Sequence, residues 1–327
     1  MRYRVRRAIR CLPIAVAVCL LVLRPETAAS AAKEGVTQCL EAVLPSLFPF
    51  FVLSRLLLNG ESKRTCSLVS RLFGRVFSVP EAALPVFLMG LVSGFPVGAS
   101  AAAELYRQGG CTKEEAERLL VFCNNCGPGF LFGAVSLRLY GGVKSALWLF
   151  VLQCLISVWL GALLGAGKVP SRREAQTSEA QRPLSFSRAL PAAVLSGGRS
   201  ALIVCAYVVF FAALTAFLPK VPLLRGMMEL TGGILCLPKT ASALPAAAFL
   251  TGFGGLAVAC QVLASLEWTD LRGTLYIPFR LLHGSVMAVT VLMWQHLPIL
   301  LPVWALLLAF SAFCVGKGRK RREIALY

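Results

Sequence analysis

Residues 83–133 read ALPVFLMGLVSGFPVGASAAAELYRQGGCTKEEAERLLVFCNNCGPGFLFG. Two apolar segments lie in this stretch, and each is interrupted by residues that disrupt helices: SGFPVG at 93–98 and NNCGPG at 124–129. Backbone N–H and C=O groups cannot stay unpaired in hydrocarbon, so an interruption at membrane depth must be buried in protein or line a wet cavity. In a membrane protein, paired interruptions of this kind point to the binding site of a transporter.

The composition places the chain in a bilayer. Of its 327 residues 57% are hydrophobic and 15% are charged, and the mean hydropathy is +0.74. Several apolar runs reach the roughly 18 residues that mark a membrane-spanning helix. The sequence therefore predicts an all-α, polytopic membrane protein in the cell membrane, with several passes, and the runs are too long for the strands of a barrel.

Charge and cysteine content exclude other classes. The net charge is +18, which is typical of Lys and Arg gathered in cytoplasmic loops. No basic face on a soluble domain is visible, so a nucleic-acid partner is not expected. The twelve cysteines lie mostly inside apolar segments, where cysteine behaves as a small hydrophobe, and no disulfide framework is indicated.

Two matches suggest an internal duplication. ALP at 83–85 leads to Gly94, as ALP at 243–245 leads to Gly252, and Gly252 follows Gly94 by 158 residues. Gly284 follows Gly127 by 157 residues. We therefore predict two inverted repeats, each containing a re-entrant hairpin and a broken helix.

The expected organisation has five parts. An N-terminal anchor helix or signal-like segment occupies 1–36, because five arginines precede a short apolar run and small residues follow it. The first repeat is 37–167, a basic cytoplasmic linker is 168–190, the second repeat is 191–316, and a basic tail is 317–327. Residues 60–79 read either as an amphipathic interfacial helix or as a basic loop, and Thr112 with Glu115 forms a capping box.

Counting passes through the membrane leaves one conflict. If 80–107 and 241–265 both re-enter, each half crosses three times and the halves are inverted, with the linker inside. The basic tail then falls outside, against the charge rule. A full span at 241–265 returns the basic tail to the cytoplasmic side but removes the symmetry between the halves. Each of the segments 80–107 and 241–265 therefore either spans the membrane or re-enters it.

The motifs SGFPVGA, the capped helix and FCNNCGPGF resemble the nucleoside-recognition (Gate) domain family, over most of residues 37–312. Within it the likeness is greatest to sporulation integral membrane proteins of the YlbJ type. The family is similar to concentrative nucleoside transporters, in which two hairpins and two broken helices meet around the substrate. The resemblance implies hairpin tips at 94–99 and 252–256, broken helices at 124–129 and 280–285, and a role in making the spore cortex. Neither expected tip carries a Gln/Thr/Glu cluster that would grip a nucleoside.

The candidate substrate-binding residues follow from the interruptions. The side-chain amides of Asn124 and Asn125 either hydrogen-bond a solute or satisfy backbone groups that the interruption leaves free. Arg280 and His283 are three residues apart and therefore share a helix face. They form part of an intramembrane site, or else Arg280 extends to the membrane interface. The set is Gly94, Phe95, Pro96, Gly98, Asn124, Asn125, Gly127, Gly252, Phe253, Gly254, Arg280 and His283.

No enzymatic motif emerges. Cys123 and Cys126 form a C-x-x-C, but there is no βαβ pattern for a redox protein and no second pair for zinc. We expect no enzyme activity, catalytic residue, metal or cofactor. The function predicted is a secondary transporter or exporter of a small polar solute, linked to sporulation; the alternative is a non-transporting membrane scaffold. The expected partners are the bilayer, the unidentified solute and, optionally, further copies in a homo-oligomer.

Overall fold

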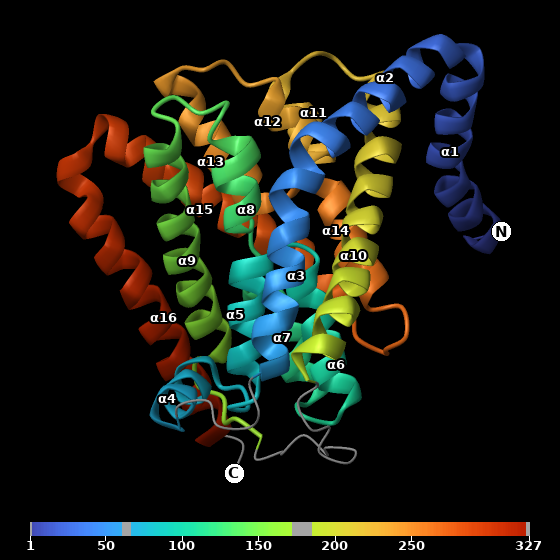
Figure 1. Ribbon diagram of the computed structural model, residues 1–327. Coiled ribbons are helices and arrows are strands. Elements are labelled where there is room, and N and C mark those ends of the chain that lie inside the picture. The colour runs from blue at the N-terminus through green and yellow to red at the C-terminus, as the bar shows by residue number, and fades with distance from the viewer. Residues whose placement is uncertain (1, 61–66, 172–184, 325–327) are drawn as a thin grey trace.

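Helices account for every regular element in residues 2–60, 67–171 and 185–324, which are the residues that the computed structural model describes (Figure 1). Five of the helical segments found there are long and apolar enough to cross a membrane: Pro25–Leu53, Val143–Gly165, Phe186–Thr215, Ala241–Ser265 and Gly273–His296. The all-helical class is confirmed, and the lengths and composition are consistent with a polytopic membrane protein.

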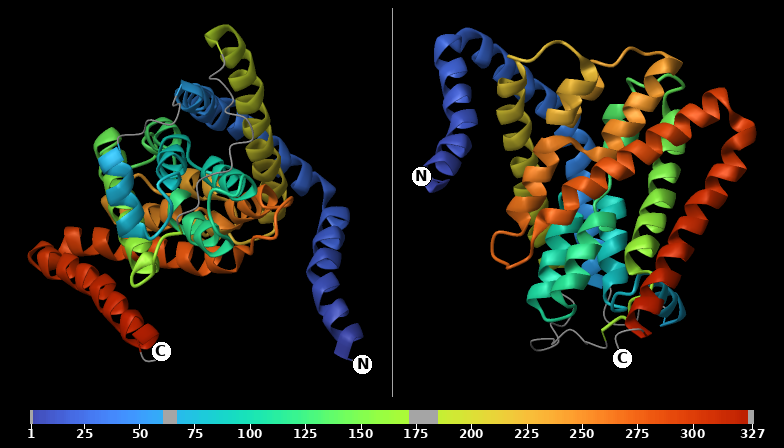
Figure 2. Two further views of the ribbon diagram at one scale, coloured as in Figure 1. Left: turned by 90° about the horizontal axis from the view of Figure 1, so that it is seen from below. Right: turned by 180° about the vertical axis from the view of Figure 1, so that it is seen from behind.

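The chain begins with α1 (Arg2–Leu23), which stands apart from the other helices in every view (Figures 1 and 2). It is followed by α2 (Pro25–Gln38), the π-turn η1 (Cys39–Val43) and α3 (Leu44–Gly60), which continue one another. α2 packs closely on α10 (Phe186–Thr215), where a Cβ at Gly35 would lie 3.0 Å from the Cβ of Ala212. The first repeat, predicted to begin at residue 37, therefore begins inside a longer helical run.

Residues 60–79 contain a helix in their described part, α4 (Ser67–Phe77). Phe73 and Phe77 are buried, whereas Leu68, Leu72 and Val76 are exposed. The exposed apolar residues alternate with Arg71 and Arg75 and favour the interfacial helix over the basic loop.

Residues 80–107 fold back on themselves. α5 (Ala83–Ser93) and α6 (Val97–Arg107) are joined by a turn at Gly94–Pro96. The two helices approach closely, since a Cβ at Gly98 would lie 3.0 Å from the Cα of Gly90. This is the hairpin interpretation of 80–107, not the single long span.

The second interruption breaks a helix without reversing it. α7 (Lys113–Cys123) begins at the predicted capping box of Thr112 and Glu115. It gives way to extended backbone at residues 124–127, after which α8 (Pro128–Phe130) and the π-turn η2 (Leu131–Val135) continue. α9 (Val143–Gly165) returns along its whole length.

A second hairpin lies where none was predicted. α11 (Pro222–Met228) and α12 (Leu230–Leu235) reverse at Glu229. A Cβ at Gly233 would collide with the backbone of Gly226, so this hairpin is closed by a glycine pair, as α5 and α6 are.

Residues 241–265 form a broken span and not a hairpin, which corrects the predicted second re-entrant element. η3 (Ala241–Ala243) and α13 (Leu244–Phe253) lead to α14 (Gly255–Ser265), with Gly254 at φ +87° between them. Gln295 donates to the carbonyl of Ala241 at 2.7 Å, and a Cβ at Gly273 would meet Leu263. α13 and α14 thus run from one end to the other of η4 and α15 (Gly273–Leu275 and Tyr276–His296).

The chain closes with η5 (Pro298–Leu300) and α16 (Leu301–Ile324). The Trp159 Nε1 of α9 donates to the carbonyl of Leu308 at 2.8 Å. α16 ends at the same end of the molecule as α4 (Figures 1 and 2). Most of the predicted linker, residues 172–184, lies outside the described residues.

Candidate functional site

The tip of the first hairpin meets the first helix break. A Cβ at Gly94 would lie 2.5 Å from the backbone nitrogen of Gly127 and 3.1 Å from the carbonyl of Asn125. Cβ atoms at Gly90 and Gly98 would both collide with the carbonyl of Cys123. Glycine is needed at these positions because backbone packs directly on backbone, and the SGFPVG and NNCGPG motifs form one junction.

Asn124 ties this junction together and is fully buried. Its Oδ1 accepts from the backbone nitrogen of Ala99 at 2.9 Å, and its Nδ2 donates to the carbonyl of Leu120 at 3.3 Å. Both bonds satisfy backbone groups near helix ends, in α6 and α7. The geometry favours the structural interpretation for this amide.

Asn125 connects three elements. Its Nδ2 donates to the carbonyl of Phe122 at 3.0 Å, while its Oδ1 accepts from the Ser157 hydroxyl of α9 at 2.7 Å. The Arg280 Nη1 of α15 lies 3.4 Å from the same Oδ1. The second amide therefore joins the first half of the chain to the second.

Gln153 is a site residue that the sequence reasoning missed. From the middle of α9 its Oε1 accepts from the backbone nitrogen of Cys126 at 3.2 Å, and its Nε2 donates to the Cys126 carbonyl at 2.6 Å. One side chain thus provides hydrogen-bond partners for both the N–H and the C=O of Cys126, in the middle of the break. A glutamine in an otherwise apolar 23-residue helix was the available signal.

Arg280 and His283 lie inside the molecule and are fully buried, so the arginine does not reach the surface of the protein. Arg280 Nη1 is 2.9 Å from His283 Nδ1, and its guanidinium carbon is 5.3 Å from the centroid of the Phe95 ring. Among the described residues, the Arg280 Nε and Nη2, the His283 Nε2 and the Tyr276 hydroxyl are buried without a hydrogen-bond partner. The pair predicted from the spacing on one helix face is formed.

The second break reaches the same place. A Cβ at Gly254 would lie 3.2 Å from Cζ of Phe95. Gly252 packs on α15, where a Cβ would lie 2.7 Å from the Cα of Gly284, and Phe253 is buried beside it. Residue 284 is in the uninterrupted helix α15, so the broken helix that the resemblance implied at 280–285 is wrong. Of the predicted site residues, Gly254 and Arg280 thus both lie near Phe95.

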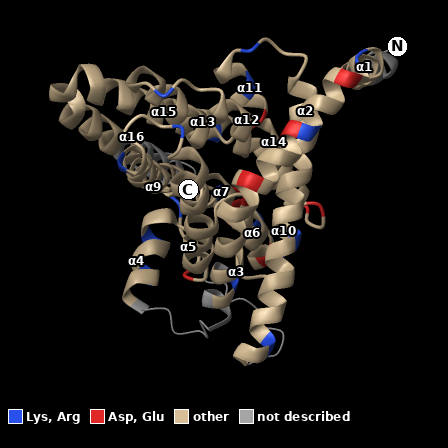
Figure 3. Ribbon diagram, turned by 45° about the horizontal axis from the view of Figure 1, so that its top comes forward, with Lys and Arg blue, Asp and Glu red and all other residues tan. Residues whose placement is uncertain are grey.

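Two cavities share Glu229 in their walls, and the smaller of them adjoins this junction. The larger has a volume of about 460 Å³ and lies among α2, η1, η2, α10, α11 and α12. Its polar lining includes Glu34, Thr37, Gln38, Glu41, Arg138, Thr215, Arg225 and Glu229. Figure 3 shows charged residues on α2 and beside α12, in this region.

The smaller cavity, of about 40 Å³, is bounded by Phe95, Cys126 and Gly127 of the junction. Glu229 and Thr231 at the tip of the second hairpin and Gln261 of α14 also line it. Glu229 borders both cavities and is 4% exposed. These three residues were missed, because the hairpin that carries two of them was not recognised.

The C-x-x-C motif does not form part of a metal centre in the described chain, where no group of three or more His, Cys, Asp or Glu could hold a metal ion. Cys123 and Cys126 are both buried at the junction.

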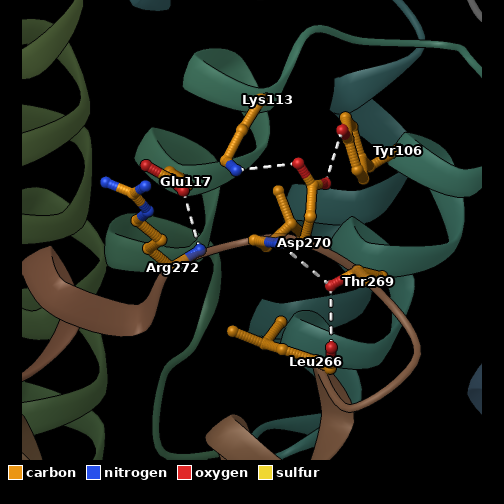
Figure 4. Close-up of polar contacts among 8 residues, drawn as sticks. Tyr106, Lys113, Glu117, Leu266, Thr269, Asp270 and Arg272 are labelled. Atoms are coloured by element: carbon orange, nitrogen blue, oxygen red, sulfur yellow. Dashed lines mark hydrogen bonds and ion pairs between the residues drawn. The ribbon is translucent and has the colours of Figure 1, made fainter.

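A polar cluster links the two halves of the chain (Figure 4). Asp270, in the loop after α14, receives a hydrogen bond from the Tyr106 hydroxyl at 2.7 Å and an ion pair from Lys113 at 2.8 Å. The backbone nitrogen of Arg272 donates to Glu117 at 2.7 Å. We call these residues, Tyr106, Lys113, Glu117, Asp270 and Arg272, the latch cluster.

Comparison with known proteins gives one curated relative. The chain is 30% identical over 329 aligned residues to the sporulation integral membrane protein YlbJ of Bacillus subtilis (strain 168), covering 85% of this chain and 80% of the relative. No family model matches the chain, and no solved structure matches it. Identity at this level over most of both chains places this polypeptide, with its apolar helices, in the YlbJ family of sporulation integral membrane proteins.

Proposed function

We propose that the protein is a multi-pass secondary transporter or exporter of a small polar solute in the cell membrane, acting in spore cortex formation. Membership of the family supports a membrane protein linked to sporulation. Transport itself is inferred from the site: two hairpins and two broken helices converge, and Glu229 connects a larger polar cavity to the smaller one at that convergence. Broken helices around a central site are the usual construction of a secondary transporter.

The proposal includes an inverted repeat, in a different register from the 158-residue offset. α5–α6 corresponds to α11–α12, and the break at 124–127 corresponds to Gly254. The α11–α12 tip touches its own helix break, since a Cβ at Gly255 would lie 2.8 Å from the carbonyl of Gly226. α3, α7–α8 and α9 then cross three times, and α10, α13–α14 and α15 cross three times in the opposite sense.

This register removes the conflict over the basic tail. With α16 as a seventh crossing, residues 317–322 end on the same side as α4 and the linker, where the charge rule requires them to be. That end is cytoplasmic in our proposal. The larger cavity lies toward the opposite end, so the conformation is open to the outside and closed at the cytoplasmic face by the latch cluster.

Uptake into proteoliposomes tests the proposal. The panel contains carboxylates, amino acids, nucleosides and sugar phosphates, and Asn125→Leu is compared with Gln108→Leu, an exposed amide on α6. We expect at least one solute to be transported and Asn125→Leu to abolish its uptake, because the amide joins the two halves. Uptake that survives in a folded Asn125→Leu protein would remove Asn125 from the site.

The scaffold remains the second candidate, and one observation favours it. Both the Asn124 amide and the Gln153 amide are fully engaged with backbone groups, as they would be in a purely structural junction. Absence of transport for the whole panel, with folded protein in the vesicles, would favour this function.

A further inference from the structure

The wall of the smaller cavity holds acceptor oxygens and no neighbouring cation. Glu229 lies at the reversal between α11 and α12, and its carboxylate accepts from the backbone nitrogens of Thr231 at 2.8 Å and Gly232 at 2.6 Å. The Thr231 side chain also hydrogen-bonds to this carboxylate. A carboxylate offers about four acceptor positions, so one remains. No ion pair joins Glu229 to a basic side chain among the described residues.

Gln261 supplies an independent sign of a ligand. It is 2% exposed, it lines the same cavity from α14, and its Oε1 is buried without a hydrogen-bond partner. A buried acceptor that lacks a partner is costly, and a buried carboxylate that lacks a counter-charge is more so. On the other side of Glu229, the Oε1 of Gln38 is also buried without a partner and lines the larger cavity.

The size and charge of the cavity restrict the ligand. A volume of about 40 Å³ exceeds the 10–15 Å³ or so that one water needs, but it is too small for a polar organic solute. A single carboxylate among neutral oxygens suits one positive charge, because divalent ions are usually held by several carboxylates or keep a large water shell.

We propose that Glu229, Thr231 and Gln261 form a binding site for a monovalent inorganic cation, Na⁺, at the contact between the second hairpin and α14. The inference rests on the proposed function and adds a coupling ion to that transporter. Because Glu229 borders both cavities, an ion enters from the larger one. Once bound, it neutralises the hairpin tip and holds it against the helix break.

The test is equilibrium binding of radioactive Na⁺ to the purified full-length protein, together with thermal unfolding in NaCl and in choline chloride at equal ionic strength. Saturable binding and a higher melting temperature in NaCl are expected. Glu229→Gln, which keeps one acceptor for the hairpin backbone, loses binding. Gln261→Met, similar in volume, weakens it by about tenfold or more, the equivalent of one lost ligand. Glu267→Gln, an exposed carboxylate on the loop after α14, binds like wild type.

Two results would overturn the site: no saturable Na⁺ binding by the wild-type protein, or undiminished binding by folded Glu229→Gln and Gln261→Met proteins. If Glu229→Gln fails to fold, Gln261→Met decides alone. Binding is measured without any solute, so failure of the cation site leaves the uptake experiment untouched. Solute uptake that is independent of Na⁺, beside absent Na⁺ binding, rejects the cation site and retains the transporter.

Discussion

At the scale of single residues, the interruptions are held by side chains that replace missing helical hydrogen bonds. Proline and glycine make a break visible in a sequence, and the position of Gly94, Asn125 and Gly127 could be predicted from their types alone. What completes the break could not: Gln153 lies 27 residues beyond Cys126, and nothing in the local pattern links them. Residue type thus predicts where a helix stops. The side chain that hydrogen-bonds to the interrupted backbone is brought there by tertiary packing.

Replacing Gln153 by Leu should destabilise the protein. The change leaves the Cys126 N–H and C=O buried without partners, and each unsatisfied group costs about 1–3 kcal/mol. Thermal unfolding in detergent measures the loss. The matched control is Gln295→Leu, which removes one exposed bond to Ala241 and should shift the midpoint far less. Equal shifts for the two variants would mean that the break does not depend on Gln153.

Replacing Arg280 is expected to abolish uptake without lowering the stability of the fold. The fully buried guanidinium has no ion pair in the described residues, and two of its nitrogens lack partners, so its burial is unfavourable. Arg280→Leu should therefore leave the free energy of unfolding within about 1 kcal/mol of wild type or raise it, while uptake is lost. Arg199→Leu, on an exposed face of α10, is the control for both measurements. A strongly destabilised Arg280→Leu protein would show that the charge is structural.

At the scale of elements, the sequence predicted the first hairpin and its broken helix well and the second pair poorly. SGFPVG interrupts a strongly apolar run and is conspicuous. α11 and α12 are only 7 and 6 residues long, with Arg225 in α11 and Glu229 between the two helices, so their pattern resembles a surface segment. The ALP match then attracted attention to 241–265, where Gly254 and Gly255 bend a helix without reversing it. Reversal depends on the Gly226–Gly233 contact across the hairpin, which is not a local property.

That contact can be tested with one methyl group. Gly233→Ala places a Cβ against the Gly226 backbone, and overpacking of this kind costs about 1–3 kcal/mol. Gly198→Ala on α10 is the control, because nothing lies within 4 Å of its Cβ position, and alanine should stabilise that helix by up to about 1 kcal/mol. The melting temperature should therefore fall for Gly233→Ala and rise for Gly198→Ala, relative to wild type. A neutral Gly233→Ala variant would count against close packing of the second hairpin.

At the scale of the whole molecule, the two ends differ. The larger cavity lies among α2, α11 and α12 at one end (Figure 1), whereas the latch cluster joins the start of α7 to the loop after α14 toward the other (Figure 4). Ser100 of α6 also donates to Ser265 of α14 at 3.1 Å. Contacts between the halves therefore close one end while the other holds open space. In a transporter with alternating access, these are the contacts that must separate.

Asp270→Asn should loosen the closed end, because it removes the ion pair with Lys113. Alkylation of buried Cys111, in the turn before α7, should become faster relative to exposed Cys236 at the other end, as followed by mass spectrometry. Glu104→Gln is the control, since its ion pair with Arg107 lies within α6.

The hydrogen bond from Lys113, and then that from Tyr106, lower the pKa of Asp270. A folded-state pKa below the unfolded value contributes stability at neutral pH that is lost as pH falls through the lowered pKa. The melting-temperature difference between wild type and Asp270→Asn should accordingly be constant around neutral pH and disappear in acid. A difference that persists in acid, or unchanged Cys111 alkylation, would show that the latch cluster does not hold this end closed.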